Sequence, residues 1–243
     1  MYSIKIKPKN TMKTIKTAFV ALMSFAAITA SAQTADEIIN KYITAMGGAE
    51  KLASLKTVKM EGNMSTQGID VAMTITKKHM MGMRVDMEIM GTSNYQIINT
   101  AKGWAFMPVM QQTEPQEMEA EQVKGAQSQL DLQGSLFNYK EKGITVEYVG
   151  VEKVDGKDAH KLKVVKGDKN SFYFIDAATN RIVKTASKAN VQGQEMDVET
   201  TFADYKQNAD GYWFAYTNNT TQGVITFDKI STNVAVDDKM FTN

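Results

Sequence analysis

The sequence contains no cysteine, and this absence removes several classes of protein at once. No disulfide can stabilise the fold, so a hydrophobic core must hold it together. No thiol is available as a catalytic nucleophile or as a metal ligand. A bacterial lipoprotein is anchored through a cysteine at its cleavage site, so no lipid anchor is predicted.

Residues that carry out catalysis are also scarce. The only histidines are His79, interpreted as a turn residue, and His160, on the polar face of a predicted strand. They are too far apart for a His-x-x-x-His zinc pair, and the acidic residues at 155–158 and 237–238 fit turns better than a calcium loop. No Gly-x-Ser-x-Gly elbow or phosphate-binding Gly-Lys-Ser/Thr loop is present. We therefore expect no enzyme activity, no metal site and no cofactor.

The sequence also lacks an apolar run long enough to span a membrane. The shorter apolar run near its start is typical of an export signal. Lys13 and Lys16 precede an apolar stretch over residues 18–28, which is shorter than the roughly 20 apolar residues that span a bilayer. Ala30-Ser31-Ala32 fits a signal-peptidase site. The sequence predicts a signal peptide over residues 1–32, cleaved after Ala32, with Met12 as its natural start.

The charge balance excludes another class of partner. Removing residues 1–32 would remove five lysines and no acid, which leaves 23 basic and 27 acidic groups. A mildly acidic chain of mixed charge has no electrostatic footprint for nucleic acid or anionic membrane. We predict a periplasmic monomer that does not span a membrane, with residues 33–243 forming a single domain, because β-rich domains reach about 200–250 residues.

Helix signals open this predicted domain. Thr34 and the acids that follow it can cap a helix, and apolar residues recur at helical spacing as far as Met46. Gly47-Gly48 ends the helix, and residues 49–55 form a short second turn. The pattern predicts an amphipathic helix whose apolar face docks on another element.

Beyond Val58 the apolar residues alternate with polar ones, which is typical of half-buried antiparallel strands. A polar stretch, residues 111–133, interrupts the pattern, and we predict a helix or two short helices over 115–132. Strands are predicted on both sides of it, over residues 58–64, 71–76, 81–89, 95–100, 103–107, 144–151, 159–165, 171–176, 182–189, 195–205, 212–219 and 224–234.

About a dozen strands in one sheet must curl or split, because large twisted sheets rarely stay open. The predicted fold class is mainly β (α+β): a strongly curved antiparallel sheet that forms a half-open barrel. The N-terminal helix and the central helical insertion are expected on its concave side, where their apolar faces are buried.

Methionine is the unusual residue of the predicted interior. The sequence has 17 methionines, and ten lie between Met60 and Met110. Methionine is flexible and polarizable, so a face rich in it suits apolar ligands of variable shape. A packed core is the alternative interpretation. If the face lines an apolar cavity, the predicted lining residues are Met60, Met64, Val71, Met73, Ile75, Met81, Met83, Val85, Met87, Ile89, Trp104 and Phe106.

Several segments carry a resemblance to a known family. They are residues 35–48, 77–85, 103–106, 173–184 and 225–241, which span nearly the whole predicted domain. The chain resembles the LolA/LolB-like superfamily of periplasmic lipoprotein carriers and outer-membrane lipoprotein-sorting proteins, in the version common among Bacteroidetes-type bacteria. One departure concerns the strand turn, where the family's Arg-Pro is replaced by Lys78-His79. The gating role of that arginine is therefore not carried over, and Arg84, which matches a later arginine, falls on the outer face.

The resemblance implies a half-open barrel whose apolar cavity shelters lipid or lipoprotein acyl chains in transit to the outer membrane. An envelope protein is a further expected partner. The alternative is a non-catalytic envelope-sensing module of the same fold with a filled core, and an exported hydrolase is disfavoured by the missing catalytic groups.

Overall fold

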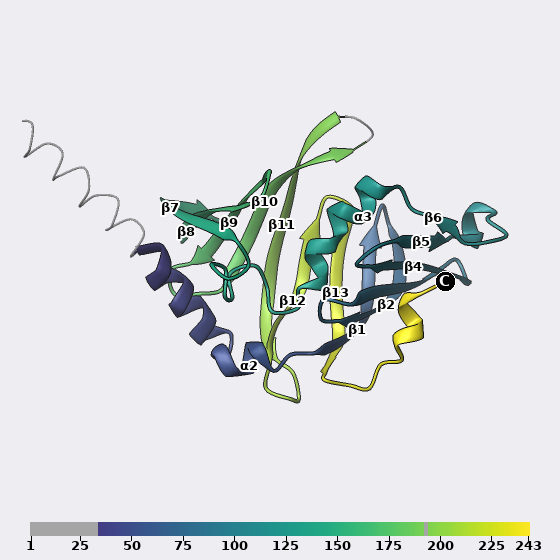
Figure 1. Cartoon of the computed structure of the whole chain (residues 1–243), viewed down its shortest axis with the longest axis horizontal. Helices are drawn as coiled ribbons and strands as arrows, with labels where there is room; N and C mark the ends of the chain where they lie inside the picture. Colours follow the sequence, from purple (N-terminus) through teal and green to yellow (C-terminus); the bar gives the residue numbers. More distant parts are fainter. Residues whose placement is uncertain (1–33, 192–193) are drawn as a thin grey trace, which may run out of the picture.

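The computed structural model describes residues 34–191 and 194–243. The predicted signal peptide, its cleavage after Ala32 and the start at Met12 lie outside the described residues. Thirteen strands form one antiparallel sheet in the order β6-β5-β4-β3-β2-β1-β13-β12-β11-β10-β9-β8-β7. Figure 1 shows the sheet curving around the helices, which lie nearer the viewer.

Twelve of the thirteen strands lie where the alternation of the sequence predicts them, whereas β6 falls inside the stretch 115–132 that was predicted as helical. The strand bounds are Thr57–Thr66 (β1), Ile69–Lys78 (β2), Gly82–Ile89 (β3), Thr92–Asn99 (β4), Gly103–Phe106 (β5), Gln116–Glu117 (β6), Ile144–Val154 (β7), Lys157–Lys166 (β8), Lys169–Asp176 (β9), Ile182–Val191 (β10), Gln194–Gln207 (β11), Trp213–Thr220 (β12) and Gly223–Thr232 (β13). Strands that follow one another in the sequence pair with each other, except β6 and β7, and β1 also pairs with β13. The sheet is open between β6 and β7, so the prediction of a strongly curved, half-open antiparallel sheet is confirmed.

The helical elements occupy the two places that the sequence indicates. The first helix covers residues 34–45 and is followed by a short α2. The insertion contains short helices on either side of β6. The remaining bounds are Ala49–Ala53 (α2), Pro108–Met110 (η1), Ala120–Ala126 (α3), Gln127–Leu130 (η2) and Asp238–Phe241 (η3).

The first helix is held by its apolar face. Ile38, Ile39 and Tyr42 are buried against apolar side chains of β7, β8 and β9, among them Leu162 and Ile175, which have no exposed surface. Burying such side chains contributes about 1.5–3 kcal/mol each. The expectation that this helix docks on the concave side is confirmed.

The insertion returns to the other end of the sheet across the concave side. We call residues 127–137 the crossing segment. Its three leucines join different parts of the core: Leu130 packs with Met83 under α3, Leu132 with the cluster around Phe227, and Leu136 with the first helix. The crossing segment therefore bridges the whole curved sheet (Figure 1).

The opposite, convex face carries a cover of its own. η3 places Phe241 over Gly82, so closely that a Cβ there would lie 2.5 Å from the phenylalanine ring. The Asn99 side chain donates to the Phe241 carbonyl at 3.0 Å, and Ile97 is 1% exposed beneath. The sheet is thus packed on both faces near β3 and β4.

Candidate functional site

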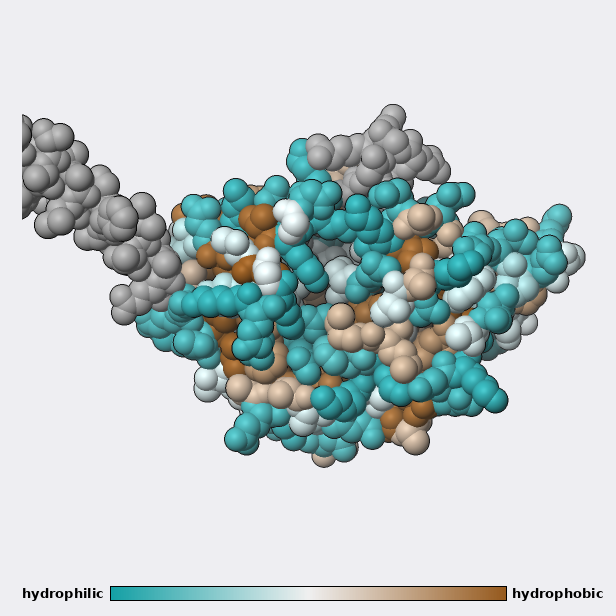
Figure 2. Space-filling model, viewed as in Figure 1, coloured by the Kyte–Doolittle hydropathy of each residue, from teal (hydrophilic) through white to brown (hydrophobic). Residues whose placement is uncertain are grey.

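Two cavities adjoin on the concave side, between the first helix, the crossing segment and strands β9–β12. The larger has a volume of about 300 Å³ and the smaller about 230 Å³. Four residues line both: Tyr42, Gly134, Phe202 and Tyr205. Figure 2 shows the molecule hollowed near its centre on this side, with both hydrophilic and apolar residues around the hollow.

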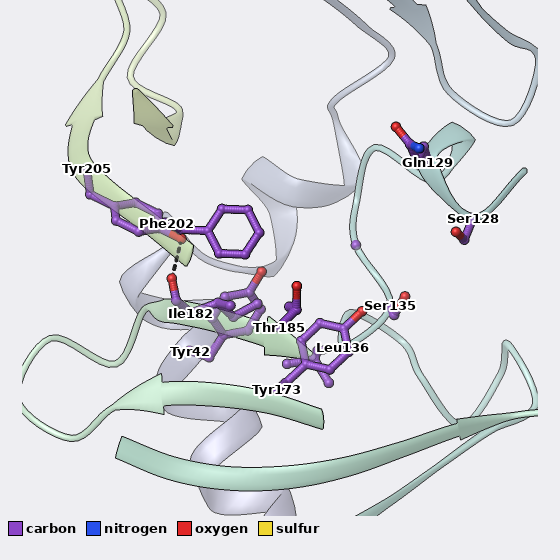
Figure 3. A pocket seen from close by; sticks show the side chains of 11 residues that line it. Tyr42, Ser128, Gln129, Ser135, Leu136, Tyr173, Ile182, Thr185, Phe202 and Tyr205 are labelled. Atoms are coloured by element: carbon purple, nitrogen blue, oxygen red, sulfur yellow. Dashed lines mark hydrogen bonds between the residues drawn. The ribbon is translucent and has the colours of Figure 1, made fainter. Parts of the chain in front are cut away.

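The larger cavity has hydroxyl-bearing side chains on several walls. Tyr173 on β9 and Thr185 on β10 are cross-strand partners, so both point to the same face of the sheet. Figure 3 shows these side chains with Tyr42 of the first helix, while Ser135 comes from the crossing segment. Tyr205 is fixed differently, because its hydroxyl donates to the Ile182 carbonyl at 2.7 Å.

The smaller cavity is lined mostly by apolar side chains. Those without a polar group are Met46, Leu52, Leu55, Met60, Leu132, Phe202, Phe214 and Ala215. The Asn218 Oδ1 atom is buried with no hydrogen-bond partner among the described residues, and this side chain lines the same cavity. The smaller cavity therefore offers an apolar enclosure with one unpaired acceptor.

A local backbone irregularity brings two aromatic side chains to this site. Phe202 and Tyr205 are three residues apart on β11, where simple alternation would place them on opposite faces. Asp204 between them adopts a left-handed conformation, with φ 55°. Such a residue interrupts strand alternation, which accounts for both rings lining the cavities.

The tyrosines of the site are hydrogen-bonding groups rather than acids. Burial raises the pKa of Tyr42 well above its usual value, and the neighbouring Tyr173 raises it further. Burial also raises the pKa of Tyr205. Both hydroxyls therefore keep their protons at neutral pH; the Tyr42 hydroxyl can donate a hydrogen bond to a ligand, whereas the Tyr205 proton is already used by the Ile182 carbonyl.

No aspartate, glutamate, lysine, arginine or histidine is among the described residues that line these two cavities. Two cations lie nearby. The Arg181 guanidinium stacks 3.8 Å from the centroid of Trp213. Lys77 lies on the concave face between Val58 and Met83, and burial lowers its pKa to about 8.

The methionine-rich face is largely packed core. Of the predicted lining residues, all of which the structure describes, Met60 alone lines one of the two cavities, the smaller. Met83, Ile75 and Val85 pack against α3 and η2, and Met73 and Val71 are buried. Strand pairing aligns the predicted row on one face, with Met64 opposite Val71, Met73 opposite Met87, and Ile89 at the end of β3. The structure therefore places the candidate binding site beside this row.

Three predicted lining residues lie elsewhere. Trp104 pairs with Ile97 and Phe106 with Tyr95, which puts both on the convex face, opposite Met83 and Ile98. The prediction that they share the methionine face is wrong, because the pairing of β5 with β4 directs both side chains to the opposite face of the sheet. Met81 lies in the β2–β3 turn and is 37% exposed, since β3 begins at Gly82.

The aromatic walls were missed by the sequence analysis. Tyr173, Phe202, Tyr205 and Phe214 lie on strands that were predicted, but no inward face was assigned to those strands. The apolar spacing of the first helix did point to Tyr42 as a docking residue. Their convergence depends on the curvature of the sheet and on the path of the crossing segment.

Both histidines make contacts within the fold. His79 Nδ1 accepts a hydrogen bond from the Leu132 backbone N–H, and His160 lies beside the Tyr148 ring. Within residues 34–191 and 194–243, no cluster of three or more His, Cys, Asp or Glu side chains could hold a metal ion. The same part of the chain contains no helix long and apolar enough to cross a membrane.

Comparison with known proteins gives the class of the fold. No protein-family model matches the sequence, and no curated protein matches it. A LolA superfamily protein from Nitrosomonas europaea aligns over 86% of this chain and 97% of its own, with a TM-score of 0.56 and 13% identity. A domain named as an outer membrane lipoprotein-sorting protein from Vibrio parahaemolyticus gives the same coverage, with a TM-score of 0.53 and 17% identity.

The molecule is thus a curved antiparallel sheet with helices on its concave side and an apolar, aromatic-walled hollow between them. This is the LolA-like fold, as the resemblance predicted. The narrower resemblance to Bacteroidetes-type members stays a prediction. At these identities the likeness establishes the fold alone.

Proposed function

We propose that this protein is a non-catalytic periplasmic carrier that binds acyl chains of lipids or lipoproteins for outer-membrane sorting. The observation that carries the proposal is the pair of adjoining cavities under the crossing segment. The walls of the smaller cavity are mostly apolar and aromatic, those of the larger also carry hydroxyl and amide groups, and no charged side chain of the described residues lines either. Such walls favour an uncharged, flexible apolar ligand.

The size of the site fits this ligand class. Small-molecule pockets usually measure about 300–1,000 Å³. The cavities, about 300 and 230 Å³, share four lining residues. A single acyl chain that runs from one cavity to the other would use both and would displace few ordered polar contacts.

The crossing segment supplies the route of entry. It is anchored by leucines at both ends and in the middle, while Gly134 and Ser135 lie directly over the larger cavity. Gly134 has φ +81°, a conformation that favours glycine. Displacing this short stretch would open the cavity without separating the sheet from the first helix.

The proposal is tested by filling the smaller cavity. Ala215 lines it, and we expect Ala215→Phe to weaken binding of a palmitoyl lipid at least about tenfold, because the new ring occupies the space of the ligand. Ala72→Phe is the matched control, since Ala72 is exposed on the convex face. Thermal unfolding should show that both variants fold. Equal binding by the two folded variants would contradict the proposal.

A further inference from the structure

The two cavities differ in the side chains that form their walls. The smaller cavity is mostly apolar, whereas the larger is lined by side chains with hydroxyl or amide groups. These are Tyr42, Ser128, Gln129, Ser135, Tyr173, Thr185 and Tyr205. A ligand that spans both cavities would therefore have an apolar tail and a polar, hydrogen-bonding end.

Three of these hydroxyls, those of Tyr42, Tyr173 and Thr185, form a group that faces the larger cavity (Figure 3). Figure 3 shows Tyr42, Tyr173 and Thr185 grouped on one side of the larger cavity. None of the three hydroxyls makes a hydrogen bond with another residue that the structure describes, and all three side chains line the cavity. None of the three is a buried atom without a partner, so each hydroxyl is open to the cavity and can donate to a ligand that enters.

The nearby cations do not line the cavities, although the Arg181 Nε atom is buried without a hydrogen-bond partner among the described residues. Arg181 stacks on Trp213 and lies 5.6 Å from the centroid of Tyr205, but it does not line either cavity. Lys77 is enclosed between the buried Val58 and Met83 and is absent from both linings. An anionic group at the hydroxyl cluster would thus lose its water without gaining an opposite charge.

We infer that the site selects acyl chains that end in an uncharged carbonyl group, an ester or an amide, and discriminates against free fatty acids. This inference rests on the proposed function. The tail occupies the smaller cavity, and the carbonyl oxygen accepts hydrogen bonds from Tyr42, Tyr173 and Thr185.

Elementary energetics sets the direction of this selectivity. An ester or amide carbonyl exchanges hydrogen bonds with water for hydrogen bonds with the cluster, which leaves its desolvation nearly balanced. A carboxylate carries a full charge, and its transfer to an uncharged cavity is far more costly. The same acyl chain should therefore bind more tightly as an ester or amide than as a free acid.

The test compares three ligands with one palmitoyl chain: 1-monopalmitoylglycerol, N-palmitoylethanolamine and palmitate. Trp213 lines the smaller cavity and can report occupancy by its fluorescence, in a full-length Trp104→Phe background that removes the convex-face tryptophan. At pH 8 we expect both uncharged ligands to bind at least about tenfold more tightly than palmitate.

Single substitutions then locate the carbonyl. Tyr173→Phe and Thr185→Val each remove one hydroxyl with little change of shape, and each should weaken ester and amide binding about two- to tenfold while leaving palmitate binding unchanged. Tyr148→Phe is the matched control, because Tyr148 lies on β7 and does not line either cavity.

The outcomes separate the two proposals. If palmitate binds as tightly as the uncharged ligands, the selectivity is contradicted while the acyl-chain site stands, and loss of that binding in Arg181→Gln would place the head group at Arg181. Failure of all three ligands to bind would contradict both proposals. Unchanged ester and amide binding in Tyr173→Phe and Thr185→Val would contradict the assigned position of the carbonyl.

Discussion

The backbone N–H of Leu132 donates a hydrogen bond to Nδ1 of His79 at 3.2 Å. This bond joins the crossing segment to the β2–β3 turn, next to the ion pair between Lys142 and Asp131 at 2.6 Å. A second bond, from the Met80 N–H to the Leu130 carbonyl at 2.8 Å, lies beside it. The cover of the cavities is thus attached at one end to a histidine, a residue whose charge can change with pH.

This attachment should weaken in mild acid. Burial lowers the pKa of His79 below its usual value, the Lys142 and Lys56 charges lower it further, and Asp131 opposes them. Between that lowered pKa and about 6.5 the unfolded chain binds a proton that the folded chain does not, so stability falls as pH drops through this window. Hydrogen exchange at the Leu132 amide should accelerate from pH 7 to pH 5 after correction for the intrinsic rate. His79→Phe should exchange fast at both pH values, and an unchanged pH response in that variant would contradict this prediction.

The methionine row should behave as core. Met83 is 6% exposed and packs against Val123 and Leu130, so we expect Met83→Asp to destabilise the fold by about 3–5 kcal/mol. Met87 is half-buried and contacts neither cavity, so Met87→Asp should cost about 1–2 kcal/mol. Urea unfolding of the two variants measures the difference. Equal losses would argue against the packing described for α3.

Two glycines provide opposite expectations for the same substitution. At Gly62 a Cβ would lie 2.1 Å from the Thr226 carbonyl oxygen, at the bulge between β1 and β13, so Gly62→Ala should destabilise by about 2–4 kcal/mol. At Gly125 within α3 a Cβ would meet no atom within 4 Å, so Gly125→Ala should stabilise by about 0.5–1 kcal/mol. Thermal unfolding of both variants checks the signs.

Removing the buried cation on the concave face should stabilise the protein. Burial lowers the pKa of Lys77 to about 8, which means that its charged form is disfavoured in the folded state. The unfolded chain binds the extra proton between about pH 8 and 10.5, so the penalty is complete below pH 8 and decreases as pH rises through this range. Lys77→Met should therefore gain about 1–3 kcal/mol at pH 7 and much less at pH 10. A gain that is independent of pH would contradict the assignment.

Most of the sheet could be predicted because alternation is a local signal. The polar and apolar positions of β1, β2 and β3 identify strands without any knowledge of their neighbours. The helical spacing around Tyr42 likewise identifies a docking face. The half-open shape follows from strand number and twist, which are properties of the chain as a whole.

The site could not be predicted in the same way, because its walls meet only in three dimensions. Trp104 and Phe106 continue the alternation of a strand, but only the pairing of β5 with β4 shows that they face outward. The left-handed Asp204 reverses the expected direction of Tyr205. The charged face of β3 also looked solvent-exposed in the sequence, whereas Phe241 covers part of it.

The acyl-chain site is tested most directly by native mass spectrometry of the protein after export into a bacterial periplasm and purification without detergent. The account predicts a bound species of defined lipid or lipopeptide mass, which should be lost in Ala215→Phe and retained in Ala72→Phe. Lipid extraction of the same sample would identify the ligand. A mass equal to that of the protein alone, unchanged after addition of an acyl ester or lipopeptide, would contradict the acyl-chain site and would favour a binding module with a filled core.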